Sequence, residues 1–576
     1  MTRRCIRTGQ IDQQARRIGV FVCHCGINIG GIVDVPEVVK YALTLPDVVY
    51  SEDNLYTCSS EGLNRIRESI REHDLSRVVV ASCTPRTHEA LFRATCEEAG
   101  LNKYLFEMAN IREHCSWAHM DEPDKATEKA KDIVGMTVAK VRLHTPQEEP
   151  EISVVPSALV IGGGISGMTA ALSLAGQGFK VCLVEREPEL GGMLRHLHKL
   201  YTTMADASEG LNKIVGAVKR NRDIDVRTST VVKRVKGFIG NFDVSLQNEN
   251  GETSNLEVGT IIVATGADVF EPVGMYGYGK LESVITQFEL ERLLKNGQLK
   301  KPGTVVMIQC VGAREEKGRT YCSRICCMTA LKNALLIKHM YPEADVYILF
   351  RDLQTYGSEY ESWHRMAQDE GIKFVKYALE KPPEVVAERD GKATIDVYHA
   401  LLGEQIRIES DLVVLSTPLV QREDARELSQ VLKVPLGPDG FFFEAHVKLR
   451  PIDFATDGIY VCGSAHSPKN SAESVSQALG AASRAAIPMA VGRLRTEAIT
   501  AEVDESLCGG CGTCVKICPY GAIEKDEKGV AKVTAVVCKG CGTCGASCPE
   551  KAITMRHFTD EQVMAQALAA FGRATA

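Results

Sequence analysis

The chain has 576 residues, of which 44% are hydrophobic and 24% are charged, and its net charge at pH 7 is −7. These values are ordinary for a globular protein of several domains, and they do not indicate nucleic acid or an anionic membrane as a partner. No apolar run approaches the roughly 18 residues of a membrane span, and no apolar segment of a secretory signal follows the basic N-terminus, so a cytoplasmic protein is expected. The 21 cysteines are unusual because they occur in clusters, which indicates metal or redox chemistry.

The first block of the chain alternates short apolar strands, such as RIGVFVCHCG and RVVVASCTP, with helical stretches. Cys23 and Cys25 end the first strand, Cys58 opens a helix and Cys83 ends another strand. The carboxyl ends of the strands in an α/β sheet converge at one edge, where ligand sites commonly lie. A [4Fe-4S] cluster is therefore expected on these four cysteines, with Cys115 as an alternative ligand. Unliganded thiols at strand ends are the alternative, because no recognised short spacing supports the site.

A glycine-rich turn follows in SALVIGGGISGMTAALSLAGQGFKVCLVERE, which reads as strand, turn, helix and strand. Gly162, Gly164 and Gly167 fit the pattern G-x-G-x-x-G, which allows a tight turn, close approach of a pyrophosphate and close helix packing. Glu185 lies 21 residues beyond Gly164 at the end of the next strand, where it is placed to accept hydrogen bonds from a ribose 2′-OH. These features resemble the FAD-binding half of the two-dinucleotide-fold flavoproteins.

Three later stretches, ELGGMLR, TIIVATGA and DGIYVCGSAHSP, support FAD binding by the same resemblance. They add these candidate FAD-binding residues: Gly191, Gly192, Ala264, Thr265, Gly266, Gly463 and Ser464. Most relatives have an aspartate at the position of Ser464, on the ribityl chain of the flavin. The local hydrogen bonds are therefore left open, whereas FAD itself is expected.

The stretch VVMIQCVGAREEKGRTYCSRICC lies where thioredoxin-reductase-like flavoproteins have a second glycine-rich turn, for NAD(P)H. Here Cys310 occupies space that the dinucleotide pyrophosphate needs, so we expect this nucleotide site to be lost. Cys310, Cys322, Cys326 and Cys327 would instead enclose a [4Fe-4S] cluster beside the isoalloxazine. A redox-active cysteine pair is the alternative, although adjacent cysteines fit it poorly because vicinal disulfides are strained.

The tail of the chain repeats one cysteine pattern, in CGGCGTCVKICP and CKGCGTCGASCP. The spacing C-x2-C-x2-C-x3-C-P is that of bacterial ferredoxins, in which the fourth cysteine of each run crosses to the other cluster. One [4Fe-4S] cluster is therefore expected on Cys508, Cys511, Cys514 and Cys548, and a second on Cys538, Cys541, Cys544 and Cys518. A zinc site would predict two pairs separated by a longer insert.

The combination of CHCG, TCSSEG, ASCTPRTHE and NIREHCSW with the FAD motifs, YCSRICC and the double ferredoxin tail resembles the family of heterodisulfide reductase A-type subunits. The resemblance covers essentially the whole chain, in the short form without a further inserted ferredoxin module. The expected class is multidomain α/β, with a thioredoxin-reductase-like flavoprotein core. The expected segments are an N-terminal iron–sulfur α/β domain at 1–150, an FAD-binding domain at 151–290 and 431–500, an inserted NAD(P)H-domain-like region at 291–430, a ferredoxin-like α+β domain at 501–556 and a C-terminal helix at 557–576.

This resemblance implies an electron-transfer protein that works by flavin-based electron bifurcation. Its implied partners are heterodisulfide reductase B- and C-like subunits, a donor of hydrogenase or formate dehydrogenase type, and ferredoxin, with the chain a homodimer in a larger complex. A disulfide or another high-potential compound would be the second acceptor. The resemblance also implies Lys332 and Glu289 as side chains near the isoalloxazine, with surface salt bridges on a helix as the alternative.

Two other functions stay open at this point. One is a self-contained NAD(P)H- or disulfide-dependent flavoprotein oxidoreductase that uses the ferredoxin tail as its acceptor. The other is a passive electron-relay scaffold in which FAD is one more relay. The sequence does not identify the physiological electron donor or the final acceptor.

Overall fold

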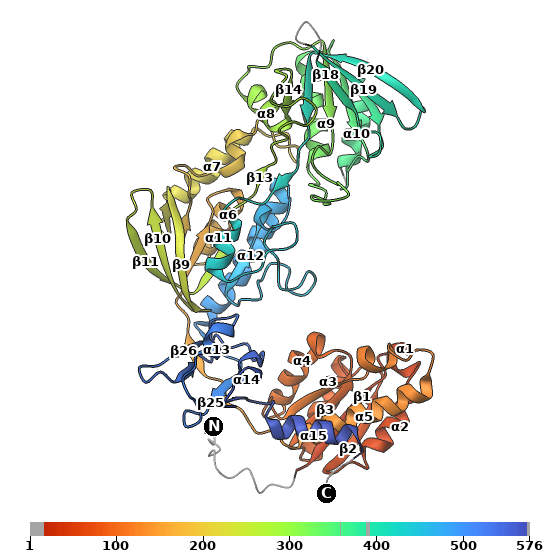
Figure 1. The fold of residues 1–576 in the computed structure, drawn as a ribbon, viewed down its shortest axis with the longest axis vertical. Helices are drawn as coiled ribbons and strands as arrows, with labels where there is room; N and C mark the ends of the chain where they lie inside the picture. The colour runs from red at the N-terminus through yellow and green to blue at the C-terminus, as the bar shows by residue number, and fades with distance from the viewer. Residues whose placement is uncertain (1–15, 358, 388–391, 573–576) are drawn as a thin grey trace. The chain divides into compact units, whose positions relative to one another are not determined.

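The structure, a computed structural model, describes residues 16–357, 359–387 and 392–572. Residues 1–15 and 573–576, which the sequence analysis assigned to the first domain and the C-terminal helix, lie outside the described residues. The chain divides into two compact units. One unit comprises the residues up to Pro150 together with those from Arg495 on, and the other runs from Glu151 to Leu494 (Figure 1). The predicted multidomain α/β class is confirmed.

A four-stranded parallel sheet forms the first part of the first unit. Its strands, in spatial order, are β2 (Val48–Asn54), β1 (Ile18–Cys23), β3 (Arg77–Ser82) and β4 (Phe106–Asn110). One face is covered by α2 (Val35–Ala42) and α5 (Pro123–Val141), and the other by α3 (Ser60–Glu72) and α4 (Pro85–Glu98). Because both faces are buried, the central strands are continuous apolar runs in the sequence. Two short helical segments follow β1 and β4, namely α1 (Ile27–Gly30) and the π-helix η2 (Arg112–Ser116).

The ferredoxin-like part of the first unit consists of two similar halves. Its short strands pair antiparallel, β25 (Ala501–Val503) with β28 (Ile553–Met555) and β26 (Ile523–Lys525) with β27 (Ala531–Val533). The short helices α13 (Thr513–Ile517) and α14 (Thr543–Ala546) follow the cysteine runs. The C-terminal helix α15 (Asp560–Ala570) then packs on α5 of the N-terminal domain (Figure 1).

The second unit begins with a five-stranded parallel sheet. The strand order is β23 (Ile459–Val461), β12 (Thr260–Val263), β6 (Ser157–Ile161), β7 (Lys180–Val184) and β8 (Ile224–Arg227). The helices α6 (Ile165–Gly176), α7 (Ala207–Arg220) and α12 (Ser471–Val491) cover one face. The opposite face carries α11 (Ala425–Leu432) and a meander of β9 (Thr230–Phe238), β10 (Asn241–Asn248) and β11 (Thr253–Val258). β5 (Glu151–Ser153) pairs with β24 (Arg493–Arg495).

The inserted region of the second unit has its own five-stranded parallel sheet. The order is β14 (Val284–Thr286), β21 (Leu412–Leu415), β15 (Thr304–Ile308), β16 (Asp345–Phe350) and β17 (Lys373–Lys376). Around it lie α8 (Gln287–Lys295), α9 (Cys326–Met340), α10 (Tyr360–Asp369) and an antiparallel sheet of β18 (Glu384–Ala387), β19 (Ala393–His399) and β20 (Glu404–Ser410). The connecting segments pair as β13 (Asp268–Val269) and β22 (Leu419–Val420), so the chain leaves the first sheet and returns to it side by side.

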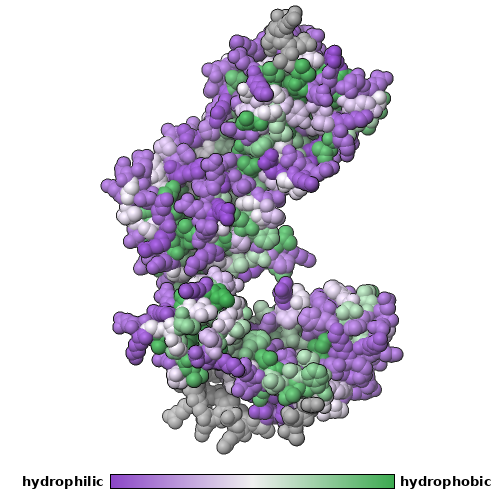
Figure 2. Space-filling model, in the orientation of Figure 1, coloured by the Kyte–Doolittle hydropathy of each residue, from purple (hydrophilic) through white to green (hydrophobic). Residues whose placement is uncertain are grey.

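Hydrophilic residues predominate on the face shown in Figure 2, with apolar residues scattered among them. The longest helix, α12, has 21 residues, but it includes Glu473 and Arg484. Within the ranges that the structure describes, no helix has both the length and the apolar composition that a membrane crossing requires.

Candidate functional site

The glycine-rich turn between β6 and α6 has no room for side chains. A Cβ on Gly167 would lie 1.8 Å from the carbonyl oxygen of Gly162, and a Cβ on Gly162 would lie 2.4 Å from that of Ala264. Gly162 also has a φ of 111°, which other residues rarely adopt. Gly164 is the N-cap of α6 and supplies no capping side chain, so the first N–H groups of the helix are available to a phosphate. This cradle fits a dinucleotide pyrophosphate.

Most of the predicted FAD-binding residues line one cavity of about 240 Å³. The predicted residues in its wall are Gly164, Glu185, Gly191, Gly192, Ala264, Thr265, Gly266 and Ser464. Gly162 and Glu185 line a smaller cavity of about 120 Å³. Gly167 packs against the carbonyl oxygen of Gly162, and the N–H of Gly463 donates to Oε1 of Gln477 at 2.9 Å.

Glu185, directly after β7, stabilises the glycine-rich turn through side-chain hydrogen bonds. Its Oε2 accepts a hydrogen bond from the N–H of Gly163 at 2.6 Å, and its Oε1 accepts one from the N–H of Glu187 at 2.9 Å. The residue is only 7% exposed and lies in the cavity wall. Each carboxylate oxygen has a second lone pair, so the side chain can brace the turn and still accept from a ribose hydroxyl.

Lys332 on α9 lies in the wall of the same cavity and forms a buried ion pair with Glu291 on α8. Both side chains are only 2% exposed. Lys332 Nζ also donates to the carbonyl oxygen of Lys199 at 2.9 Å, and Glu291 Oε2 accepts from the N–H of His198 at 2.9 Å. Burial lowers the pKa of Lys332, and the attraction of Glu291 opposes that shift. The ion pair therefore places one positive and one negative charge, which compensate each other, in the cavity wall.

Glu289, the other residue expected near the flavin, lies elsewhere. It is the third residue of a capping box at the start of α8, where its Oε2 accepts from the N–H of Thr286 at 2.6 Å. Its Oε1 accepts from the hydroxyl of Tyr278 at 3.1 Å, and it is not among the residues that line the cavity. Sequence reasoning therefore missed Glu291, although helical periodicity could have found it. The buried face of α8 repeats at Gln287, Leu290, Glu291 and Leu294.

Lys469 is a second cavity residue that sequence reasoning missed. It precedes α12 and lines the same cavity as Ser464. Its Nζ lies 3.2 Å from Nδ1 of His466, whose Nε2 lies 2.7 Å from Oε2 of Glu444. Burial, with a contribution from the charge of Arg324, lowers the pKa of Lys469 to about 8. No local sequence pattern marks this lysine, because the tertiary fold alone places it in the cavity.

The four cysteines of the inserted region come together at the start of α9. Burial raises the pKa of Cys326, and the neighbouring thiolates of Cys310, Cys322 and Cys327 raise it further. Burial also raises the pKa of Cys327 to about 12, with a contribution from Cys310 and Cys322. Four neighbouring thiolates without a cation would repel one another, so the donor set fits an iron–sulfur cluster. Cys326 also lines the 240 Å³ cavity, which places this sulfur site beside the predicted flavin site.

Cys310 has a left-handed backbone conformation, which is common for glycine and rare for residues that carry a side chain. Its φ is 62°, in the left-handed region, two residues after the end of β15. Left-handed conformations of residues other than glycine, asparagine and aspartate are uncommon and cluster at functional sites. Cys25 after β1 has the same feature, with a φ of 48°. The two strand-end cysteines thus lie in turns of similar backbone geometry.

The N-terminal cysteines also lie close together. Burial raises the pKa of Cys83 to about 11, with contributions from the thiolates of Cys25 and Cys23, and the same two thiolates contribute to a raised pKa of Cys58. The N–H of Cys25 donates to Sγ of Cys23 at 3.2 Å. Cys115 differs, because its thiol donates to the carbonyl oxygen of Ala126 at 2.9 Å within the hydrophobic core.

The structure brings together the crossing set of cysteines predicted for the tail. Cys508, Cys511, Cys514 and Cys548 surround one small cavity. The two halves match in detail, because the N–H of Ala522 donates to Sγ of Cys518 at 3.3 Å and the N–H of Ala552 donates to Sγ of Cys548 at 3.3 Å. Such N–H donors stabilise thiolate sulfur, as expected of ligands to an iron–sulfur cluster.

Two family models match parts of the chain. Residues 156–311 match the family model for pyridine nucleotide-disulphide oxidoreductases, and residues 501–555 match that for a 4Fe-4S dicluster domain. A thioredoxin reductase from T. acidophilum is similar in fold with a TM-score of 0.40 and 16% identity, over 58% of this chain and 98% of that chain. The flavoprotein and dicluster models make the chain an FAD-dependent oxidoreductase that carries iron–sulfur clusters.

Two relatives match over almost their full length. The chain is 42% identical to the first iron-sulfur A-type subunit of the CoB--CoM heterodisulfide reductase of Methanopyrus kandleri, over 96% of this chain and 98% of the relative. It is also 42% identical to the A-type subunit of the H(2):CoB-CoM heterodisulfide,ferredoxin reductase of Methanothermobacter marburgensis, over 96% and 97%. The resemblance inferred from the motifs is confirmed: the chain belongs to the family of heterodisulfide reductase A-type subunits.

Proposed function

We propose that this chain is the component of a heterodisulfide-reductase-like complex that receives electron pairs and divides them by flavin-based electron bifurcation. The observation that carries the proposal is the position of Cys326, which belongs to a convergent set of four cysteines and also lines the cavity of the FAD-binding glycines. A flavin bound there would be next to a one-electron partner. That proximity is what the division of an electron pair requires.

Bound FAD supplies two-electron and one-electron redox chemistry, and [4Fe-4S] clusters accept single electrons. The glycine-rich turn and the uncapped start of α6 hold the pyrophosphate, while Glu185 accepts from the ribose. The buried ion pair of Lys332 and Glu291 lies in the cavity wall, and Lys469 adds a second cationic side chain to it. We assign to Lys332 and Glu291 the role near the isoalloxazine that the sequence analysis gave to Lys332 and Glu289.

We further propose four clusters: two in the tail, one on the cysteines at the start of α9, and one on Cys23, Cys25, Cys58 and Cys83. Support for the N-terminal cluster comes from the closeness of its four sulfurs. Arg112 Nη1 lies 3.4 Å from Sγ of Cys25 and favours the thiolate form that an iron ligand needs.

The partners are proposed from the printed names of relatives. A Methanococcus maripaludis relative, 37% identical over 95% of this chain, is named as the A-type subunit of the H(2)/formate:CoB-CoM heterodisulfide,ferredoxin reductase. By analogy with that name, the donor would be of hydrogenase or formate dehydrogenase type. The homodimer and the B- and C-like subunits are proposed from the sequence resemblance alone. Ferredoxin would be one acceptor, and a disulfide or another high-potential compound would be the second.

A self-contained NAD(P)H-dependent oxidoreductase is the rival function. The side chain of Cys310 argues against it, because it occupies the turn where a nucleotide pyrophosphate would approach the backbone. The test is anaerobic donor oxidation by the reconstituted complex, with reduction of ferredoxin and of the high-potential acceptor recorded together. We expect the two reductions to be coupled at a fixed ratio. Reduction of the flavin of the isolated chain by NADH, followed by reduction of ferredoxin alone, would support the rival.

A further inference from the structure

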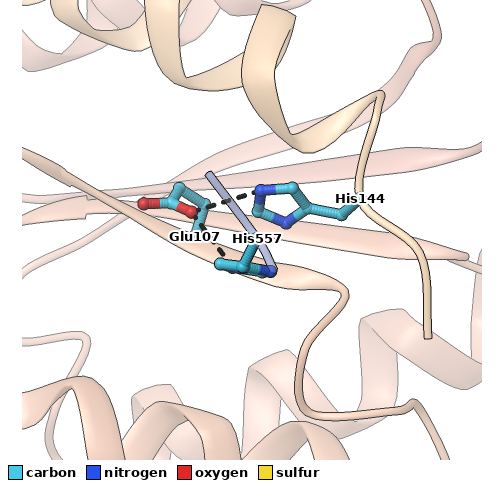
Figure 3. Close-up of side chains that lie close together, drawn as sticks. All are labelled: Glu107, His144 and His557. Atoms are coloured by element: carbon cyan, nitrogen blue, oxygen red, sulfur yellow. Dashed lines mark ion pairs between the residues drawn. The ribbon is translucent and has the colours of Figure 1, made fainter. Parts of the chain in front are cut away.

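Three side chains from distant parts of the first unit lie close together (Figure 3). Glu107 lies on β4, His144 follows α5, and His557 lies between β28 and α15. Nε2 of each histidine is 3.4 Å from Oε2 of Glu107. One potential ligand atom from each of the three residues lies within 4.8 Å of the other two. None of these residues belongs to the FAD cavity or to a cysteine cluster.

The two imidazoles are buried without hydrogen-bond partners. The side chain of His144 is 0% exposed and that of His557 is 2% exposed. Nδ1 of each ring has no hydrogen-bond partner among the described residues, and the 3.4 Å approach of each Nε2 to Glu107 Oε2 lacks the alignment of a hydrogen bond. A buried polar atom without a partner is costly, and native proteins leave few of them. Two such rings directed at one carboxylate therefore indicate a ligand that bonds to all three.

We propose that Glu107, His144 and His557 bind a divalent metal ion, with zinc as the best match. Imidazole nitrogen and carboxylate oxygen are the donors that zinc takes in proteins besides thiolate. Donor atoms around a tetrahedral zinc lie about 3.4 Å apart, as bonds of about 2.0–2.2 Å require. The separations from Glu107 Oε2 to the two Nε2 atoms have this value. The two ring centroids lie only 3.8 Å apart, so the imidazoles would have to move apart to place both Nε2 atoms on one tetrahedral ion.

Lys140 is the feature that opposes a cation here. Its Nζ donates to Oε2 of Glu107 at 3.0 Å and lies 3.8 Å from the ring centroid of Phe558. A carboxylate that binds a metal commonly accepts a hydrogen bond from a neighbouring group as well, so this contact is compatible with a site. The ammonium charge nevertheless repels the ion. Removal of the Lys140 charge should therefore strengthen metal binding, whereas in a metal-free network it would only leave Glu107 unpaired.

The site would fasten the C-terminal segment to the N-terminal domain. His557 directly precedes α15, which packs on α5, and Nε2 of Gln562 donates to the carbonyl oxygen of Leu143 at 3.1 Å. A metal bond from His557 to Glu107 would add a cross-link between residues 450 positions apart in the sequence. The expected role is structural, since both histidines are buried and the site lies apart from the redox cysteines.

The test measures the zinc content of the holoprotein by elemental analysis, after dialysis against a series of buffered zinc concentrations. The samples must have a full iron content, so that iron and not zinc occupies the cysteines. The wild type should retain one zinc per chain, and His557→Gln and His144→Gln should each lose it while they keep iron and FAD. His73→Gln, at the end of α3 away from these residues, should retain it. Lys140→Met should reach half occupancy at a zinc concentration at least tenfold lower than the wild type.

Two results would overturn the proposal: a wild type that holds no more zinc than His557→Gln at any concentration, or weaker zinc binding by Lys140→Met. If His557→Gln folds poorly, the iron content reveals it, and the Lys140→Met measurement still decides the question. Because iron and FAD are measured in the same samples, loss of the zinc site is distinguishable from failure of the proposed redox function.

Discussion

Lys332 and Glu291 form a buried ion pair in the wall of the cavity to which the FAD-binding glycines contribute. The neighbouring Glu289 instead caps α8. Truncation of one partner of a buried pair leaves an uncompensated charge, which costs about 3–5 kcal/mol, whereas loss of a helix cap costs about 1 kcal/mol. We therefore expect Glu291→Ala to be clearly less stable than Glu289→Ala in urea unfolding and to bind FAD more weakly. Equal effects of the two substitutions would contradict the assignment of Glu291 to the cavity.

Two glycines of α6 offer a matched pair of substitutions. A Cβ at Gly167 would overlap the carbonyl oxygen of Gly162, whereas a Cβ at Gly176 has no atom within 4 Å. Gly167→Ala should therefore displace the turn and abolish FAD binding, and Gly176→Ala should bind FAD like the wild type. The flavin-to-protein ratio after purification measures both. Full flavin content in Gly167→Ala would show that the turn does not bind the dinucleotide as described.

The affinity for FAD should depend on pH through Lys469. Burial lowers its pKa to about 8, so the side chain is charged at pH 7 and neutral at pH 9. The charged form attracts the anionic pyrophosphate of FAD, and affinity should consequently fall as the pH rises through about 8. Fluorescence titration of the apoprotein with FAD at several pH values measures this. Lys469→Met should bind FAD with an affinity that does not change over this range.

Lys199→Met is the matched control for Lys469, because Lys199 lines the same cavity. That variant should keep the pH dependence of the wild type. A pH dependence that persists in Lys469→Met would assign the effect to another group.

The crossing of cysteines in the tail gives a test by iron counting. Cys511 and Cys548 lie around one cavity, and Cys518 belongs to the other predicted set. The double variant Cys511→Ser/Cys548→Ser should lose about four irons, the same as either single variant, whereas Cys511→Ser/Cys518→Ser should lose about eight. FAD content should stay at the wild-type level in all of them. A loss of eight irons from the first double variant would show that the ligands do not cross.

The sequence predicted best the features that short-range spacing encodes. The cysteine runs of the tail and the glycines at 162, 164 and 167 are local patterns, because one loop supplies three of the four predicted ligands of each cluster and one turn faces the pyrophosphate. Glu291 was missed because the resemblance to the family suggested Glu289. The helical periodicity of α8, which places Glu291 on the buried face, was not used. Lys469 and the meeting of Glu107 with His557 depend on contacts between distant segments. No single-sequence pattern encodes such contacts.

The contact between the tail and the N-terminal domain also depends on segments that are far apart in the sequence. The two were expected as separate segments, with no prediction of a contact between them; in the structure both belong to one compact unit. The contact arises because α15 packs on α5 and Gln562 bonds to Leu143. The apolar residues of α15 do not form one regular stripe in the sequence, so its partner was not predictable from the pattern of the helix alone.

The cysteines at the start of α9 are proposed to hold a cluster beside the FAD cavity. The iron and FAD content of Cys326→Ser tests this cluster, by comparison with the wild type and with Cys182→Ala, which removes a buried thiol of β7 outside all the clusters. We predict about 16 irons per chain for the wild type and for Cys182→Ala, about 12 for Cys326→Ser, and one FAD in each. An iron content of Cys326→Ser equal to that of the wild type, with FAD retained, would contradict the account.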